Sequence, residues 1–212
     1  MGEDGATRCG LVAIAGAPNV GKSTLLNRIL GRHLSIATSK PQTTRTRVLG
    51  IETRGDVQMI FTDTPGIHEP RGLLHERMVD HARSGLRGAD LTLWLLAADR
   101  GLGRTDRAEL PQLAQEGGRQ DGRAVIVVIN KMDLLPRQDL LPLMAAVGEL
   151  LPEASCVPAS AKSGENVERL VDEIATRIPA GPWLYPADAL SDQPARFFAA
   201  ELVREQLFLQ LQ

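Results

Sequence analysis

Residues 16–23 read Gly-Ala-Pro-Asn-Val-Gly-Lys-Ser, and this stretch decides the fold because it matches the pattern G-x-x-x-x-G-K-[ST]. A short apolar run, Leu11 to Ala15, comes directly before it, and a segment of helical character, Gly21 to Leu30, begins inside it. A loop placed between a strand and a helix in this way turns backbone N–H groups toward phosphate oxygens at the positive end of the helix. The stretch therefore predicts a nucleotide-binding loop rather than an ordinary glycine-rich turn.

Two side chains of this loop are expected to act on the phosphates. Lys22 reaches the β and γ phosphates and is a predicted catalytic residue, while the Ser23 hydroxyl ligates Mg²⁺. The other positions predicted to contact the nucleotide are Gly16, Ala17, Pro18, Asn19, Val20, Gly21 and Thr24. The loop by itself does not choose between ATP and GTP.

Working outward from the loop, apolar runs that read as strands alternate with amphipathic segments of helix length. Further strands are predicted at Val57 to Phe61, Leu91 to Ala97, Ala124 to Ile129 and Ser155 to Pro158, and further helices at Leu73 to Leu86, Asp106 to Gln115, Leu140 to Leu151 and Glu165 to Ile178. Such alternation predicts parallel strands joined by crossover helices, and nearly continuous apolar runs suit strands covered on both faces. We predict an α/β fold, a doubly wound and mostly parallel six-stranded sheet with helices on both faces. A hairpin turn at Thr53 to Asp56 predicts one antiparallel pairing near the sheet edge.

Two later motifs select the base. Asn130-Lys131-Met132-Asp133 ends the strand Ala124 to Ile129, and the Asp133 carboxylate can accept hydrogen bonds from guanine N1–H and the exocyclic amine but not from adenine. Asn130 is expected to brace the loops and face guanine N7, and the Lys131 stem to cover the base. In Ser160-Ala161-Lys162, the Ala161 N–H is expected to meet guanine O6. The ordered set predicts a P-loop GTPase domain.

Two further loops are expected to sense the γ phosphate. Asp63-Thr64-Pro65-Gly66 follows the strand Val57 to Phe61, so the Asp63 carboxylate can support the magnesium shell and the Gly66 N–H can meet the γ phosphate. The polar segment Thr38 to Thr46 supplies Thr44 as the second hydroxyl ligand of Mg²⁺, with Thr43 as the alternative. Thr44 and Gly66 join Lys22 as the predicted catalytic residues.

Composition limits the classes of function. Hydrophobic residues make up 43% and charged residues 24%, as in ordinary soluble domains, and the formal net charge of -2 gives no overall basic field for nucleic acid. Cys9 and Cys156 lack a metal-ligand spacing, which fits a reduced compartment. No apolar run approaches the length of a membrane span. We expect a cytoplasmic monomer whose membrane association, at the inner face of the cell membrane, is at most peripheral.

The end of the chain changes in composition. Residues 1–179 are predicted to form the GTPase domain, and residues 180–194, rich in proline, a linker. Residues 195–212 have helical periodicity and read as the first helix of a second domain that the chain lacks. The alternative is a helix that docks back on the same domain.

The motifs GAPNVGKST, KPQTTRTR, DTPGIHEP, NKMD and SAK together resemble the Era family of bacterial GTPases, a group within the TrmE–Era–EngA type of translation GTPases. The tail QPARFFAAELVREQL resembles the junction that leads into the RNA-binding KH domain of that family. The resemblance implies GTP and GDP as substrate and product, and a role in assembly of the small (30S) ribosomal subunit and processing of its 16S rRNA. It implies that rRNA is bound through the KH domain, which the chain lacks.

Three residues bear on catalysis. Ile67 follows DTPG and cannot orient water as the glutamine of Ras-like enzymes does, so intrinsic turnover should be slow. His68 is a candidate base, although an exposed loop histidine without a catalytic role is the preferred interpretation. Similar GTPases with an asparagine at the position of Asn19 use it to hold K⁺, with carbonyls near Thr38 and Lys40 completing the site. Asn19 shaping the loop is the equal alternative.

Two other functions compete with the switch enzyme. One is a nucleotide-dependent binding module with negligible turnover, suggested by Ile67 and the truncated tail. The other is a related GTPase that acts in tRNA modification or large-subunit assembly, against which the tail and KPQTTR argue.

Overall fold

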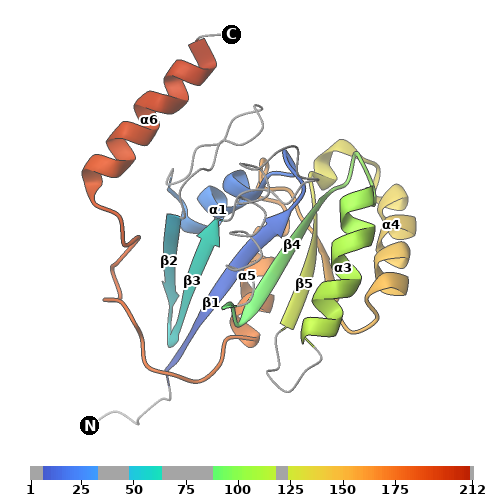
Figure 1. Ribbon diagram of the computed structural model, residues 1–212, viewed down its shortest axis with the longest axis horizontal. Coiled ribbons are helices and arrows are strands. Elements are labelled where there is room, and N and C mark those ends of the chain that lie inside the picture. Colours follow the sequence, from blue (N-terminus) through green and yellow to red (C-terminus); the bar gives the residue numbers. More distant parts are fainter. Residues whose placement is uncertain (1–6, 33–47, 64–87, 118–123, 211–212) are drawn as a thin grey trace.

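One six-stranded sheet forms the centre of the molecule in the computed structural model, which describes residues 7–32, 48–63, 88–117 and 124–210 (Figure 1). The strand order is β2-β3-β1-β4-β5-β6. β2 pairs with β3 antiparallel, and every other neighbouring pair is parallel. The strands are β1 (Arg8–Gly16), β2 (Val48–Arg54), β3 (Val57–Asp63), β4 (Leu91–Ala97), β5 (Ala124–Asn130) and β6 (Ser155–Pro158). The predicted sheet and its antiparallel edge hairpin are confirmed.

Helices cover both faces of this sheet, as predicted. α1 (Lys22–Leu30) and α5 (Val167–Thr176) share one apolar core with the β1 residues Val12 and Ile14, whereas α3 (Arg104–Gly117) and α4 (Arg137–Leu150) share the other with Ala13 and Ala15. Alternate β1 side chains thus enter opposite cores because successive residues of a strand point to opposite faces. The predicted helix Leu73 to Leu86 lies outside the described residues.

Element ends differ from the predictions by a few residues. β1 begins at Arg8 rather than Leu11, because its pairing with β3 extends from Arg8 opposite Val57 through residues without an apolar pattern. α4 begins at Arg137, three residues before the predicted Leu140, directly after Pro136. Its first turn is exposed, so apolar periodicity does not report it. The backbone, rather than side-chain pattern, sets both ends.

Residues 179–194, here called the strap, include the predicted linker 180–194 and pack along the β2–β3 hairpin. The Cys9 N–H donates to Pro179 O at 3.1 Å, and the Ile51 N–H of β2 donates to Leu190 O at 2.9 Å. Gln58, fully buried in β3, accepts hydrogen bonds from two strap N–H groups, Leu184 and Tyr185, at 3.0 Å each.

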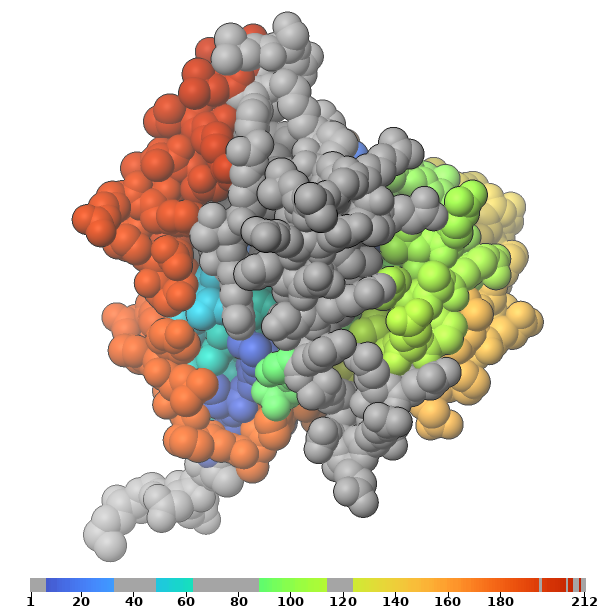
Figure 2. Space-filling model, in the orientation of Figure 1, coloured from blue at the N-terminus to red at the C-terminus, as the bar shows by residue number. Residues whose placement is uncertain are grey.

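After the strap, α6 (Ala195–Gln210) continues beyond the end of β2 (Figure 1). In the space-filling view, the strap and α6 line one side of the molecule and α3 and α4 the other (Figure 2). The strap therefore connects α6 to the edge of the sheet that β2 forms.

Candidate nucleotide-binding site

The predicted phosphate loop joins the carboxyl end of β1 to α1, and its two flanking glycines are required sterically. Gly16 has φ 135°, and a Cβ there would lie 2.4 Å from the Leu95 carbonyl oxygen. Gly21 has φ 99°, and a Cβ there would lie 2.3 Å from Asn130 Nδ2. Both positions combine a left-handed backbone with a close neighbour, so only glycine fits.

Lys22 and the start of α1 bring positive charge to this loop. The Lys22 side chain is only 9% exposed, and its Nζ donates to Gly16 O at 3.1 Å and to Ala17 O at 2.9 Å. The N-cap residue of α1 is Gly21, which has no side chain to cap the N–H groups of the first turn. A helix N-terminus with a buried lysine beside it suits an anion with several oxygens, such as a polyphosphate. Ser23 and Thr24 follow in the same first turn, half-buried.

Asn130 joins the phosphate loop, residues 16–23, to the loop at residues 160–162, the second of the two loops predicted to bind the base. Its side chain is 1% exposed; Nδ2 donates to Val20 O at 2.7 Å, and Oδ1 accepts from the Ala161 N–H at 2.9 Å. These bonds form the brace expected of Asn130. The same Ala161 N–H is the one predicted to meet guanine O6, so a bound base would share this donor with Asn130 or displace it. The O6 contact stays a prediction.

The remaining residues of Asn130-Lys131-Met132-Asp133 turn sharply away from β5. Lys131 has φ 63°, and its Nζ lies 3.9 Å from Asp99 Oδ1. Met132 is buried and its N–H donates to Ala159 O at 3.2 Å, whereas Asp133 is exposed in a single 3₁₀ turn, η1 (Met132–Leu134). This turn leaves the Asp133 carboxylate open to a ligand.

Ser160-Ala161-Lys162 is held by its own loop. Ser160 is fully buried; its N–H donates to Glu165 O at 3.0 Å and its Oγ accepts from the Ser163 N–H at 3.1 Å. Gly164, with φ 91°, donates its N–H to Ser160 O at 2.8 Å. The loop is therefore fixed in shape by local hydrogen bonds, while its position depends on longer-range contacts.

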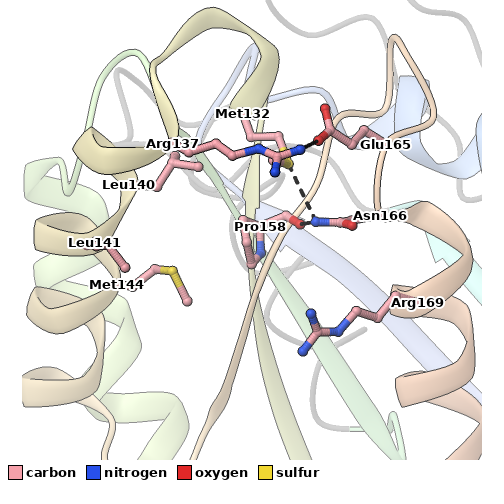
Figure 3. A pocket seen from close by; sticks show the side chains of 9 residues that line it. All are labelled: Met132, Arg137, Leu140, Leu141, Met144, Pro158, Glu165, Asn166 and Arg169. Carbon is pink, nitrogen blue, oxygen red and sulfur yellow. Dashed lines mark hydrogen bonds and ion pairs between the residues drawn. The ribbon is translucent and has the colours of Figure 1, made fainter.

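Behind the base loops, a hollow of about 340 Å³ separates α4 from α5 (Figure 3). Arg137 bridges to Glu165 at 2.9 Å across it, and Asn166 Nδ2 donates to Pro158 O at 3.0 Å. The hollow is lined by Met132, Arg137, Leu140, Leu141, Met144, Pro158, Glu165, Asn166 and Arg169. Met132 is the one predicted base-site residue in this lining, so the hollow is not the predicted nucleotide site.

Several predicted site residues lie outside the described residues: Thr43, Thr44, Thr64, Pro65, Gly66, Ile67 and His68. Asp63 closes β3, opposite Ile14 of β1 in the sheet register, which brings its backbone to the strand end that precedes the phosphate loop. Among the described residues, no three His, Cys, Asp or Glu side chains gather as a metal site. The predicted Mg²⁺ ligands, Ser23, Thr44 and Asp63, include only one residue of these four types, so this finding does not bear on them.

Two arginines at this site carry no sequence signal. Arg28 Nε donates to Ala161 O at 2.9 Å and its Nη2 donates to Lys162 O. Arg100 Nη1 donates to Pro18 O at 3.3 Å. Arg28 reads as an ordinary basic residue in the last turn of a helix, and Arg100 as a solvated loop residue, because their partners are distant in sequence.

Fold and site together define the class, a P-loop GTPase domain. The phosphate loop follows β1 and the base loops follow β5 and β6, so all of them lie at the carboxyl ends of these parallel strands. Residues 11–131 match the family described as 50S ribosome-binding GTPase. Within the described part of the chain, no helix has the length and apolar character needed to span a membrane.

Individual relatives are more specific. The chain is 46% identical over 201 residues to GTPase Era of Geotalea uraniireducens strain Rf4, covering 95% of this chain and 66% of that protein. It is 44% identical to GTPase Era of Bradyrhizobium sp. strain BTAi1, covering 97% of this chain and 65% of the relative. The chain thus spans just under two thirds of the length of these curated relatives.

Solved structures agree. A crystal structure of an Aquifex aeolicus Era variant bound to GDP and AlF4⁻ superimposes with a TM-score of 0.86 at 41% identity, covering 96% of this chain and 68% of that one. Era in complex with MgGDPNP and nucleotides 1506–1542 of 16S ribosomal RNA gives a TM-score of 0.84 at 42% identity, covering 94% of this chain and 67% of that one. This chain belongs to the Era family of GTPases.

Proposed function

We propose that this chain binds GTP and GDP and hydrolyses GTP, acting as a switch between two conformations. The observation that carries the proposal is the double hydrogen bond of Asn130, which ties the phosphate loop at Val20 to the base loop at Ala161. Two loops that must hold opposite ends of one nucleotide are thereby fixed relative to each other before it binds. Membership in the Era family supports the same function.

The division of roles among the residues is part of the proposal. Asp133 would read guanine N1–H and the exocyclic amine, with Lys131 against the base and the 160–162 loop at O6. Lys22 and the N–H groups of residues 16–24 would hold the phosphates. Residues 1–179 would form the GTPase domain, and residues 195–212 would begin a second one.

Mg²⁺ is the expected metal, and the residues fit it. Ser23 stands in the first turn of α1, one residue after the lysine of the phosphate loop, and β3 ends at Asp63 beside β1. Ser23 and Thr44 would be hydroxyl ligands and Asp63 would support the shell. When bound, Mg²⁺ neutralises charge that develops on the phosphates during transfer. Lys22 would stabilise the same charge from the protein side.

A monovalent cation at Asn19 is a further proposal. With Ile67 unable to orient water, turnover would depend on positioning, Lys22 and an added cation such as K⁺. Asn19 itself has φ 62°, a left-handed conformation that asparagine tolerates, so loop shape alone also explains this residue. Equal turnover in Na⁺ and K⁺ at fixed ionic strength would reject the K⁺ site.

Ribosomal RNA is the proposed macromolecular partner. The related Era structure holds nucleotides 1506–1542 of 16S rRNA, which supports a role in small-subunit assembly and 16S rRNA processing. The formal charge of -2 gives this chain no basic field of its own, so we assign rRNA binding to a KH domain outside it. We also propose a cytoplasmic location, a monomeric state and peripheral contact with the inner face of the cell membrane. Sedimentation with anionic vesicles tests the membrane contact.

Titration with fluorescent GDP in Mg²⁺, competed by GTP and by ATP, tests the core proposal. Asp133→Asn should shift the preference from guanine toward xanthine nucleotides, because the amide can donate to the extra carbonyl of xanthine. Equal competition by ATP would reject guanine selectivity. Single-turnover hydrolysis with and without small ribosomal subunits then separates a switch enzyme from a binding module: no hydrolysis in either condition would reject the enzyme.

A further inference from the structure

Arg28 connects the helix that carries the phosphate-binding residues to the loop predicted to read the base. It lies six residues after Lys22 on α1, and its guanidinium crosses to two successive carbonyls of the base loop, Ala161 and Lys162. These partners are 133 and 134 residues away in sequence. A guanidinium that holds two carbonyls fixes direction as well as distance, because its donors form a rigid planar fork.

The Ala161 peptide group is held from both sides. Its N–H donates to Asn130 Oδ1 at 2.9 Å, and its carbonyl accepts from Arg28 Nε at 2.9 Å. Asn130 sets the loop against β5, and Arg28 sets it against α1. Ala161 as a whole is 2% exposed, so packing and the two hydrogen bonds together hold this peptide group.

A role confined to α1 does not account for this geometry. Arg28 is the basic residue in the last turn of α1, and a cation there interacts favourably with the helix C-terminus. Its guanidinium, however, donates to two carbonyls of the 160–162 loop, Ala161 O and Lys162 O, and not to the last carbonyls of the helix. A Cβ built on Gly164, which has φ 91°, would lie 3.8 Å from Arg28 Nη1, an ordinary contact distance, so the guanidinium lies against this loop.

We infer that Arg28 is a positioning residue that aligns the Ala161 N–H with the base and so sets how long a guanine nucleotide stays bound. The inference rests on the proposed function, since it requires that the nucleotide site bind guanine. It assigns to Arg28 the link between phosphate binding by α1 and base reading by the 160–162 loop. Without that link, the phosphates would still bind while the contact at O6 loosens.

The test compares two nucleotides that differ at the base contact. Arg28→Met keeps the apolar stem and removes the donors, whereas Arg28→Lys keeps the positive charge but replaces the planar fork with a single ammonium nitrogen. Arg107→Met, on the exposed face of α3, is the matched control. Dissociation rate and Kd are measured for GDP and for 2-aminopurine riboside 5′-diphosphate, which lacks O6 and the N1 proton but keeps the exocyclic amine, so the effect of each variant is compared as a ratio to wild type for each nucleotide. We expect Arg28→Met to weaken GDP binding about tenfold, mostly through faster dissociation, because the hydrogen bond from the misaligned Ala161 N–H to O6 would be lost. The analogue should change less than about twofold, and Arg28→Lys should lie between.

Three results would overturn the inference. One is unchanged GDP dissociation in Arg28→Met. Another is an equal loss for GDP and the analogue, which marks a general structural role. If Arg28→Met does not fold, Arg28→Lys decides, and a GDP-to-analogue ratio equal to that of the wild type rejects alignment. Failure of the proposed function appears separately, as a wild-type protein that does not prefer GDP to ADP.

Discussion

Asn130→Ala should destabilise the nucleotide-free protein, because it removes the side chain that joins the phosphate loop to the 160–162 loop. The Asn130 amide satisfies Val20 O at 2.7 Å and the Ala161 N–H at 2.9 Å, and the residues that carry these groups are 4% and 2% exposed. Leaving a buried polar group unsatisfied costs roughly 1–3 kcal/mol. Two such groups give about 4 kcal/mol, which water entering the vacated space lowers to about 3 kcal/mol.

Urea unfolding followed by circular dichroism, without nucleotide, measures this loss directly. In a domain of this size, about 3 kcal/mol corresponds to a fall in Tm of about 9 °C. Gln112→Ala, an exposed amide on α3, is the matched control and should change stability by less than about 0.5 kcal/mol. Asn130→Asp keeps an acceptor for the Ala161 N–H but turns an oxygen toward the Val20 carbonyl, so it should be as unstable as the alanine variant.

The result that would refute this reasoning is a loss below about 1 kcal/mol for Asn130→Ala. The loops would then be held by their own local hydrogen bonds, and the pre-organised site on which the proposed function depends would lack its main support. Gly21→Ala is an independent probe of the same contact, since its Cβ would lie 2.3 Å from Asn130 Nδ2; wild-type stability in that variant would contradict the geometry.

Three further outcomes are expected. Gln58→Leu removes the bonds to the Leu184 N–H and its neighbour, so hydrogen exchange in the strap should quicken at least about tenfold; unchanged exchange would mean that other contacts hold the strap. Burial raises the pKa of the Cys156 thiol to about 11, so iodoacetamide at pH 9 should label this thiol far more slowly in the folded than in the unfolded protein. Because the pKa is higher in the folded state, the contribution of the protonated thiol to stability is complete below pH 9 and is lost as the pH rises through 11. Asp106→Ala leaves Trp94 Nε1, which donates to Asp106 at 2.9 Å, without its acceptor and should cost about 2 kcal/mol in urea unfolding; a cost near zero would show that water replaces the carboxylate.

The sequence by itself determined the class of fold and the places of the loops. β4 has the predicted ends, Leu91–Ala97, because a nearly continuous apolar run bounded by polar residues reports a buried strand directly. The phosphate loop is also visible in the sequence, because its glycines, lysine and serine act within eight successive residues. Local chemistry at a fixed spacing is what a linear pattern can encode.

Only the tertiary structure decided which distant groups meet. Arg28 reaches Ala161 O across 133 residues, Asn130 reaches Val20 O across 110, and Gln58 binds the strap across 126. Each is a polar side chain that satisfies a backbone group of another segment, and such a partner depends on how the chain folds back rather than on neighbouring residues. The proline-rich segment 180–194 reads as a linker because its composition predicts no regular structure. The hydrogen bonds that hold it come from β2, β3 and the residues at the start of β1.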